Sequence, residues 1–90
     1  MNDTKIIIGS LSNDLYRVAT LANRGSINGA KRFHRESQRW IKDLETKQLK
    51  GYVKKIIHKL KNSDVDRIKE DAEDYLMYSI LLQNYALHLT

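Results

Sequence analysis

Five basic side chains share one side of the segment from residue 27 to residue 44, provided that this segment is a helix. At 100° per residue they occupy an arc of about 100°, and they are Lys31, Arg32, Arg35, Arg39 and Lys42. We call them the basic stripe. Such a stripe can hold the anionic groups of an acidic protein, a nucleic-acid backbone or lipid headgroups, or it can be an ordinary solvated face. We predict that it is the partner- or anion-binding surface of the chain.

An acidic protein is the partner that the stripe predicts first, and a nucleic-acid backbone is the alternative. Contacts to a backbone would be made to phosphate, with little sequence discrimination. Base stacking needs aromatic side chains among the basic ones, whereas Phe33 and Trp40 fall on the opposite face. A helix-turn-helix over residues 19–40 fits poorly, because Lys31 stands where that motif needs a buried residue. Membrane-surface binding is a third alternative, but an apolar face that contains Ala30 and Ser37 suits packing on protein better.

Charge is unevenly spread along the chain, whose formal net charge is +5. Residues 31–61 hold eleven Lys or Arg against three acids, and residues 64–74 hold six acids against two bases. If the last two helices form an antiparallel hairpin, Lys50 comes near Asp74 and other lysines meet the acidic run similarly. Within the stripe, two arginines can pair with acids four residues further along their own helix. The stripe residues then left without a partner are Lys31, Arg35 and Lys42.

No combination of residue types predicts catalysis or metal binding. There is no cysteine, and the three histidines are far apart in the chain, at His34, His58 and His88. No histidine is placed to activate a serine nucleophile, whether Ser37, Ser63 or Ser79. The acids of residues 64–74 are expected to be the solvated start of a helix, whose dipole favours negative charge there. We therefore predict a protein that is not an enzyme, with no catalytic residue, cofactor, metal or small-molecule substrate.

The elements that must position these residues are predicted to be helices. The chain has no proline and four glycines, which is too little turn chemistry for a strand-rich fold. Apolar residues spaced three and four apart predict helices at residues 4–23, 27–45, 48–61 and 64–89. Gly25 is the expected stop of the first helix, and Ser26 is the expected cap of the second. We predict an all-α, antiparallel three- or four-helix bundle that forms one domain over residues 1–90.

The same spacing predicts which residues form the core. In the first helix they are Ile8, Leu11, Leu15, Val18 and Ala22. In the second they are Ala30, Phe33, Ser37, Trp40, Ile41 and Leu44. Trp40 is expected to be the largest contributor, whereas Asp14 is expected to lie away from the apolar face.

Two boundaries follow from the pattern. In a continuous helix, the nine residues from Leu44 to Val53 would rotate the apolar stripe by roughly 180°, so we predict a break near residues 45–48. Further along, Ser63 and Asp66 are spaced as in a capping box, just ahead of a new apolar series. The last helix is therefore expected to begin there.

The last predicted helix is apolar on two faces. One face is a heptad series that contains Val65, Ile68, Ala72, Tyr75, Ser79, Leu82, Ala86 and Leu89. The far face carries Met77, Ile80 and Leu81, interrupted by Asn84 and His88. A helix that is apolar on two faces should be buried on two faces, so we expect it to be the central helix, the seam of a homodimer, or both. The residues predicted for the dimer interface are Tyr75, Met77, Ile80, Leu81, Asn84 and His88.

These observations predict a small interaction or adaptor protein of the cytoplasm. The first six residues show neither the apolar region nor the cleavage site of a secretory leader. The longest apolar run begins at Leu76 and is interrupted at Ser79, far short of the roughly 20 residues that a membrane span needs. We expect self-association through the last helix, and an acidic partner on the basic stripe.

Overall fold

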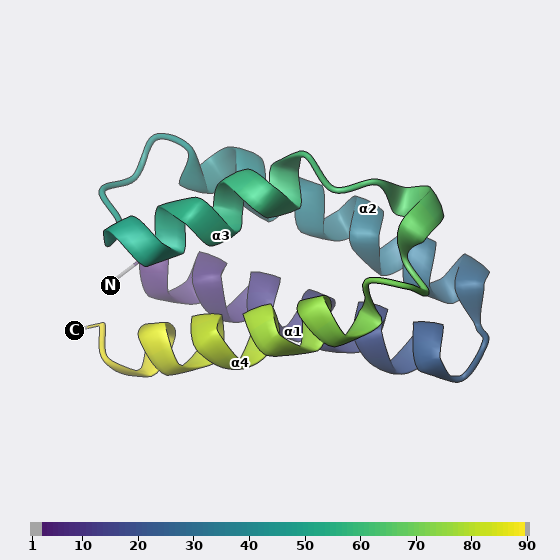
Figure 1. The fold of residues 1–90 in the computed structure, drawn as a ribbon. Helices are drawn as coiled ribbons and strands as arrows, with labels where there is room; N and C mark the ends of the chain where they lie inside the picture. Colours follow the sequence, from purple (N-terminus) through teal and green to yellow (C-terminus); the bar gives the residue numbers. More distant parts are fainter. Residues whose placement is uncertain (1–2, 90) are drawn as a thin grey trace.

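The computed structural model describes residues 3–89, and all the regular secondary structure within this range is helical. Four α-helices, α1 (Asp3–Asn23), α2 (Ile27–Leu44), α3 (Gly51–Lys61) and α4 (Ala72–Leu87), are joined by short connections, the last of which contains the 3₁₀ turn η1 (Val65–Arg67). Successive helices run in opposite directions, so that α1 begins and α4 ends at the same end of the molecule (Figure 1). The prediction of an all-α helical bundle is confirmed.

The stop between α1 and α2 is the one that the sequence predicts. Gly25 has a φ of +84°, a left-handed conformation that glycine adopts without strain. Its N–H donates to the carbonyl oxygen of Ala22, and the Ser26 N–H donates to that of Leu21, which is the Schellman pattern of helix ends. Ser26 stands at the N-cap of α2, but its side chain makes no capping hydrogen bond. The expected Ser26 side-chain cap is therefore wrong.

The predicted break between the second and third helices is confirmed. After Leu44 the chain makes one tight turn, closed by a hydrogen bond from the Lys47 N–H to the Leu44 carbonyl oxygen. Residues 48–50 are not helical, and Lys50 is extended at φ −61° and ψ 153°. The third helix therefore begins at Gly51, three residues later than predicted. The break lets both helices turn their apolar faces to the same core.

The predicted start of the last helix is wrong. The Asp64 carboxylate accepts a hydrogen bond from the Asp66 N–H at 2.9 Å, and this local bond holds residues 65–67 in a 3₁₀ turn. The expected cap, Ser63, instead donates to the Leu60 carbonyl oxygen behind it. The helix proper starts at Ala72, although Ile68 in the turn already lies in the core at 1% exposure. The apolar series of the sequence thus continues through a segment that is not α-helical.

This late start changes which charges meet across α3 and α4. Lys50 borders a depression together with Asn84 and His88, at the C-terminal end of α4. Lys59, at the other end of α3, borders one with Asp71 and Asp74. The expected proximity of Lys50 to Asp74 is therefore wrong, because the ten residues between the two helices shift the register of the hairpin.

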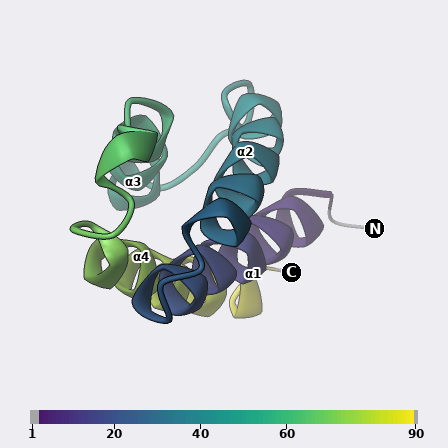
Figure 2. The same cartoon turned by 90° about the vertical axis from the view of Figure 1, so that its right-hand side faces the viewer.

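The helix with the most extensive packing in the bundle is α1. It packs along both α2 and α4, and the end-on view shows it at the lower edge of the bundle, next to both (Figure 2). The five apolar residues predicted for its inner face are all 0% exposed. The heptad face of the last predicted helix is also buried, from Ile68 through Ala86. Because α4 packs by this one face, the expectation that it is the central helix is wrong.

Trp40 contributes less to the core than predicted. It is partly buried at the edge, and its Nε1–H donates to Oδ2 of Asp14 at 2.9 Å. Asp14 is itself only 8% exposed, so its expected position away from the core is wrong. The two side chains form a polar link between α1 and α2. The largest fully buried side chain is Tyr75, on α4.

Candidate functional site

The basic stripe lies on the outer face of α2, as predicted. Arg32, Arg35, Arg39 and Lys42 are exposed, and Lys31 is half-buried. The opposite face of the helix is buried against α1 and contains Ala30, Ser37 and Ile41. The structure therefore brings the five basic side chains together on one solvent-facing side of one helix.

One member of the stripe has an acidic neighbour that the sequence did not indicate. Lys31 Nζ lies 3.9 Å from Oδ1 of Asp66, so the expectation that Lys31 is free is wrong. Within residues 3–89, by contrast, no ion pair joins Arg32 to Glu36 or Arg39 to Asp43. An exposed pair such as Lys31–Asp66 is worth roughly 0–1 kcal/mol. Most of the charge of the stripe therefore faces solvent.

The outer face of α4 carries large apolar side chains that the described part of the chain leaves uncovered, among exposed polar ones such as Glu73 and Gln83. Met77 is 48% exposed, Ile80 54% and Leu81 38%. Asn84 and His88 are exposed on the same helix. Tyr75 differs from the other residues predicted for the dimer interface, because it is 2% exposed and is covered within one chain. Surface for a second molecule therefore remains at the other five positions.

Two more residues extend this apolar face. Leu87 is 62% exposed and stands seven residues after Ile80, so the heptad spacing of the sequence contains a signal for it. Tyr16 is 54% exposed and lies on α1, beside a groove of about 240 Å³ that it lines together with Ile80 and Asn84. Nothing in the sequence links Tyr16 to this face, since the link depends on how α1 packs against α4. We call Tyr16, Met77, Ile80, Leu81 and Leu87 the apolar face.

Two hydrogen bonds position side chains near this face, one between α1 and α4 and one within α4. Ser12 Oγ of α1 donates to the Ser79 carbonyl oxygen of α4 at 3.0 Å, which fixes the two helices beneath the groove. Near the end of α4, Nδ1 of His88 lies 2.7 Å from the Asn84 carbonyl oxygen. The His88 ring is therefore tied to its own helix by a backbone contact.

A serine and a histidine meet in the bundle, although none was expected to. Nε2 of His34 lies 2.8 Å from Oγ of Ser63, and the His34 ring stands edge-on to Tyr75 with 6.0 Å between ring centroids. His34 therefore lies beside Ser63, a neighbour that the sequence did not indicate. The sequence gives no sign of the pair, because it forms only when α2 packs beside the turn after α3.

This pair is arranged as a structural contact. The Ser63 hydroxyl donates its proton to the Leu60 carbonyl oxygen at 2.7 Å, so His34 Nε2 must be the donor in its own contact with Ser63. A histidine that donates to the serine is not placed to act as its general base. Burial lowers the pKa of His34, which favours the neutral ring.

Tyr75 and Asp14 are two further buried groups whose ionisation is shifted. The Tyr75 hydroxyl is buried, and no group within residues 3–89 meets it with full hydrogen-bond geometry, although the Ser63 hydroxyl lies close by. Burial raises the pKa of Tyr75, and nearby carboxylates reinforce the shift. Burial also raises the pKa of Asp14, and repulsion from Glu36 raises it further by a smaller amount. The hydrogen bond from Trp40 lowers the pKa and so opposes both effects.

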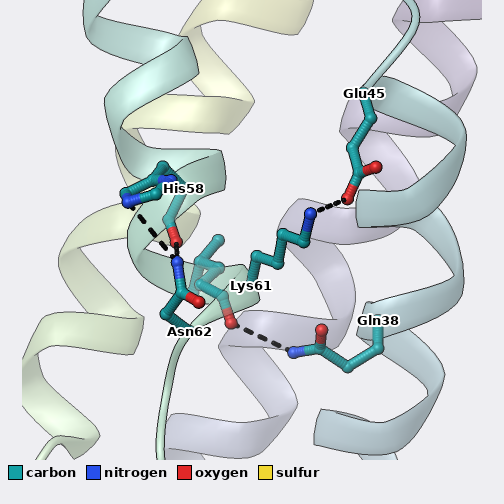
Figure 3. Close-up of polar contacts among 6 residues, drawn as sticks. Gln38, Glu45, His58, Lys61 and Asn62 are labelled. Atoms are coloured by element: carbon teal, nitrogen blue, oxygen red, sulfur yellow. Dashed lines mark hydrogen bonds and ion pairs between the residues drawn. The ribbon is translucent and has the colours of Figure 1, made fainter.

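A cleft with one basic wall, formed by α3, opens between α2 and α3. Two contacts bridge the helices there: Lys61 Nζ lies 3.0 Å from Oε1 of Glu45, and Gln38 Nε2 donates to the Leu60 carbonyl oxygen at 3.1 Å (Figure 3). On the α3 side, Asn62 Nδ2 donates to the His58 carbonyl oxygen at 2.9 Å. The volume of the cleft is about 360 Å³, and its lining residues are Leu44, Glu45, Lys47, Leu49, Lys54, Ile57, His58 and Lys61.

Metal-binding clusters and membrane spans were sought over the described part of the chain. In residues 3–89, no three histidine or acidic side chains are grouped so that they could hold a metal ion. Over the same residues, none of the helices combines the length and the apolar character that crossing a bilayer requires. The candidate sites are therefore the basic stripe, the apolar face and the α2–α3 cleft.

Comparison of the chain with protein-family models, with curated proteins and with solved structures gives no match in any of the three.

Proposed function

We propose that this protein is a non-enzymatic interaction protein that forms a homodimer through the apolar face and binds an acidic partner on the basic stripe. The observation that carries the proposal is the exposure of large apolar side chains along one side of α4. Four of the seven exposed large hydrophobic residues in residues 3–89 belong to this helix. A chain without cysteine suits a reducing compartment, so the proposed setting is the cytoplasm.

Covering the apolar face would release a substantial free energy. Removal of apolar surface from water contributes about 25 cal/mol per Å². The 16 residues of α4 span roughly 24 Å, and Tyr16 widens the face onto α1. A stable interface buries about 800 Å² per partner, so a two-fold contact between two copies would have to take in side chains of α1 as well as those of α4. A second copy is the preferred occupant because a two-fold contact needs only one self-complementary patch.

The exposed charge of the basic stripe supports the second half of the proposal. Arg35, Arg39 and Lys42 are exposed and make no ion pair within residues 3–89. A nucleic-acid backbone remains the alternative partner, since phosphate would be attracted to the same side chains. Against it, Phe33 and Trp40 are partly buried against the core, so the stripe carries no aromatic side chain on which bases could stack.

The dimer is tested by measuring molecular mass in solution by light scattering. Wild type is expected to have the mass of two chains, and Ile80→Glu that of one, because a charge at the centre of the apolar face cannot be buried unpaired. Arg39→Glu is the matched control, since it also introduces a carboxylate, but on the outer face of α2, and it should leave the mass unchanged. A wild-type protein that stays monomeric at high concentration would contradict the proposal.

The basic stripe is tested by pull-down and by nucleic-acid binding. Arg35→Glu combined with Arg39→Glu is expected to remove bound acidic proteins without changing the dimer mass. If every partner is retained, the stripe is solvated surface only. Binding of random-sequence DNA at low salt, lost as salt is raised, would instead support the nucleic-acid alternative.

A further inference from the structure

The cleft between α2 and α3 has one basic wall formed by a single side of α3. Lys54, His58 and Lys61 are spaced four and three residues apart, which aligns them on one face of the helix. All three are exposed, and all three line the cleft. Lys47, on the connection between the helices, closes one end.

The floor of the cleft is aliphatic. Leu44 is 1% exposed and Ile57 6% exposed, while Leu49 is partly buried and packs against the core. Two contacts, Gln38 to Leu60 and Glu45 to Lys61, bridge α2 and α3 beside the cleft (Figure 3). The cleft is therefore a supported depression with an apolar base, unlike the convex outer face of α2.

The charge of the cleft is positive and only partly balanced. Three lysines stand around it against one carboxylate, Glu45, which is already paired with Lys61. In residues 3–89, neither Lys47 nor Lys54 makes an ion pair. The cleft thus offers two cationic side chains beside an aliphatic surface, which together match a ligand that carries both carboxylates and an aliphatic group.

We propose that this cleft binds an acidic peptide segment of a partner protein, which places an aliphatic side chain against Leu49 and Ile57 and carboxylates near Lys47 and Lys54. The proposal rests on the proposed binding of an acidic partner and adds the place where that partner is anchored. The one aromatic ring in the described lining of the cleft is that of His58, and the absence of Phe, Tyr and Trp from this lining disfavours base stacking and hence nucleic acid. The acidic run of a second copy is also a poor ligand, because its branched aliphatic residues pack on their own core: Ile68 is 1% exposed and Val65 is partly buried.

The test uses a fluorescein-labelled peptide of alternating glutamate and serine with two leucines, titrated against the full chain at low salt. Lys54→Glu is expected to weaken binding about five-fold, more than the loss of a single exposed ion pair because the charge is reversed. Lys55→Glu is the matched control, since Lys55 is an exposed neighbour in the same helix that does not line the cleft. It should change the affinity less than about two-fold. A peptide with both leucines replaced by serine should bind at least about ten-fold more weakly.

Each outcome decides for or against the cleft. Equal losses for Lys54→Glu and Lys55→Glu, or equal binding of the leucine and serine peptides, would overturn it. Tighter binding of single-stranded DNA than of the peptide would also overturn it, in favour of a phosphate ligand. If Arg35→Glu abolishes peptide binding and Lys54→Glu leaves it intact, the basic stripe stands and the cleft fails. In the opposite result, the cleft stands and the stripe fails.

Discussion

The helices α2 and α4 have similar lengths, 18 and 16 residues, yet they present opposite surfaces to solvent. Each buries one face against α1. The outer face of α2 carries exposed arginine and lysine, whereas that of α4 carries exposed Met77, Ile80 and Leu81. Hydration of the charged outer face of α2 is favourable, whereas exposure of the apolar side chains of α4 to water is unfavourable. Two helices that both pack one face against α1 thus differ in the outer surface that they leave for other molecules.

This difference assigns the two helices different tasks. The charges of α2 are stable in water and become useful when an anionic partner arrives, so the contact they support is reversible and sensitive to salt. The apolar side chains of α4 favour a long-lived contact, because returning them to water costs free energy. A lasting dimer and an exchangeable acidic partner are the pairing that these two surfaces support.

The largest expected effect is a difference in stability between substitutions on the buried face and on the outer face of α4. Leu82→Ala removes a side chain that is 0% exposed, and it should lower the free energy of unfolding by about 2–5 kcal/mol. In the monomeric Ile80→Glu background, Leu81→Ala, on the outer face of the same helix, should cost less than about half as much as Leu82→Ala, because part of the Leu81 side chain is then in water. Urea denaturation at one fixed protein concentration measures both. Equal losses would show that the two faces do not differ in burial.

A smaller effect is expected from the inner face of α2. Trp40→Phe leaves the buried Asp14 carboxylate without its hydrogen-bond donor, and it should lower the free energy of unfolding by about 1–3 kcal/mol. Asp14→Asn keeps an oxygen that can accept the Trp40 N–H, and it is expected to be milder. If Asp14→Asn proves the more damaging of the two, the Trp40–Asp14 link is not the stabilising contact described here.

The smallest effect is a pH dependence at the contact between α2 and α4. The pKa of His34 is lowered in the folded chain from 6.5, so below pH 6.5 the unfolded chain takes up a proton first and the free energy of unfolding decreases. His34→Gln keeps a donor for Ser63 but cannot titrate, and it should flatten this decrease. Denaturation curves between pH 5 and pH 7 measure it, with His58→Gln, on the exposed side of α3, as control. A slope that survives in His34→Gln would assign the effect to another group.

Much of the fold could be predicted because one face of each helix is strictly periodic. The buried series on α1 and the series from Ile68 to Ala86 appear in the sequence as apolar residues three and four apart. The start of α4 could not be predicted in this way. Ile68 continues the apolar series directly after the 3₁₀ turn that the Asp64 carboxylate stabilises. Periodicity does not distinguish such a segment from an α-helix.

The candidate sites divide along the same line. The basic stripe and most of the apolar face lie within single helices, so the positions of Arg35 or Ile80 follow from spacing alone. Contacts between segments far apart in the chain leave no such signal. His34 meets Ser63, and Tyr16 lines a groove with Ile80, only because of how the helices pack. The cleft beside Lys54 belongs to this second class, since its two walls come from different helices.

The most direct test of the dimer uses single cysteines, because the chain has none of its own. Ile80→Cys, at the middle of α4, is compared under mild oxidation with Arg39→Cys on the outer face of α2. If the apolar faces of two copies cover each other about a two-fold axis, Ile80→Cys will form a disulfide-linked dimer rapidly and at low protein concentration, while Arg39→Cys will stay monomeric on a non-reducing gel. If the two variants cross-link equally slowly, the outer face of α4 is not where two chains meet.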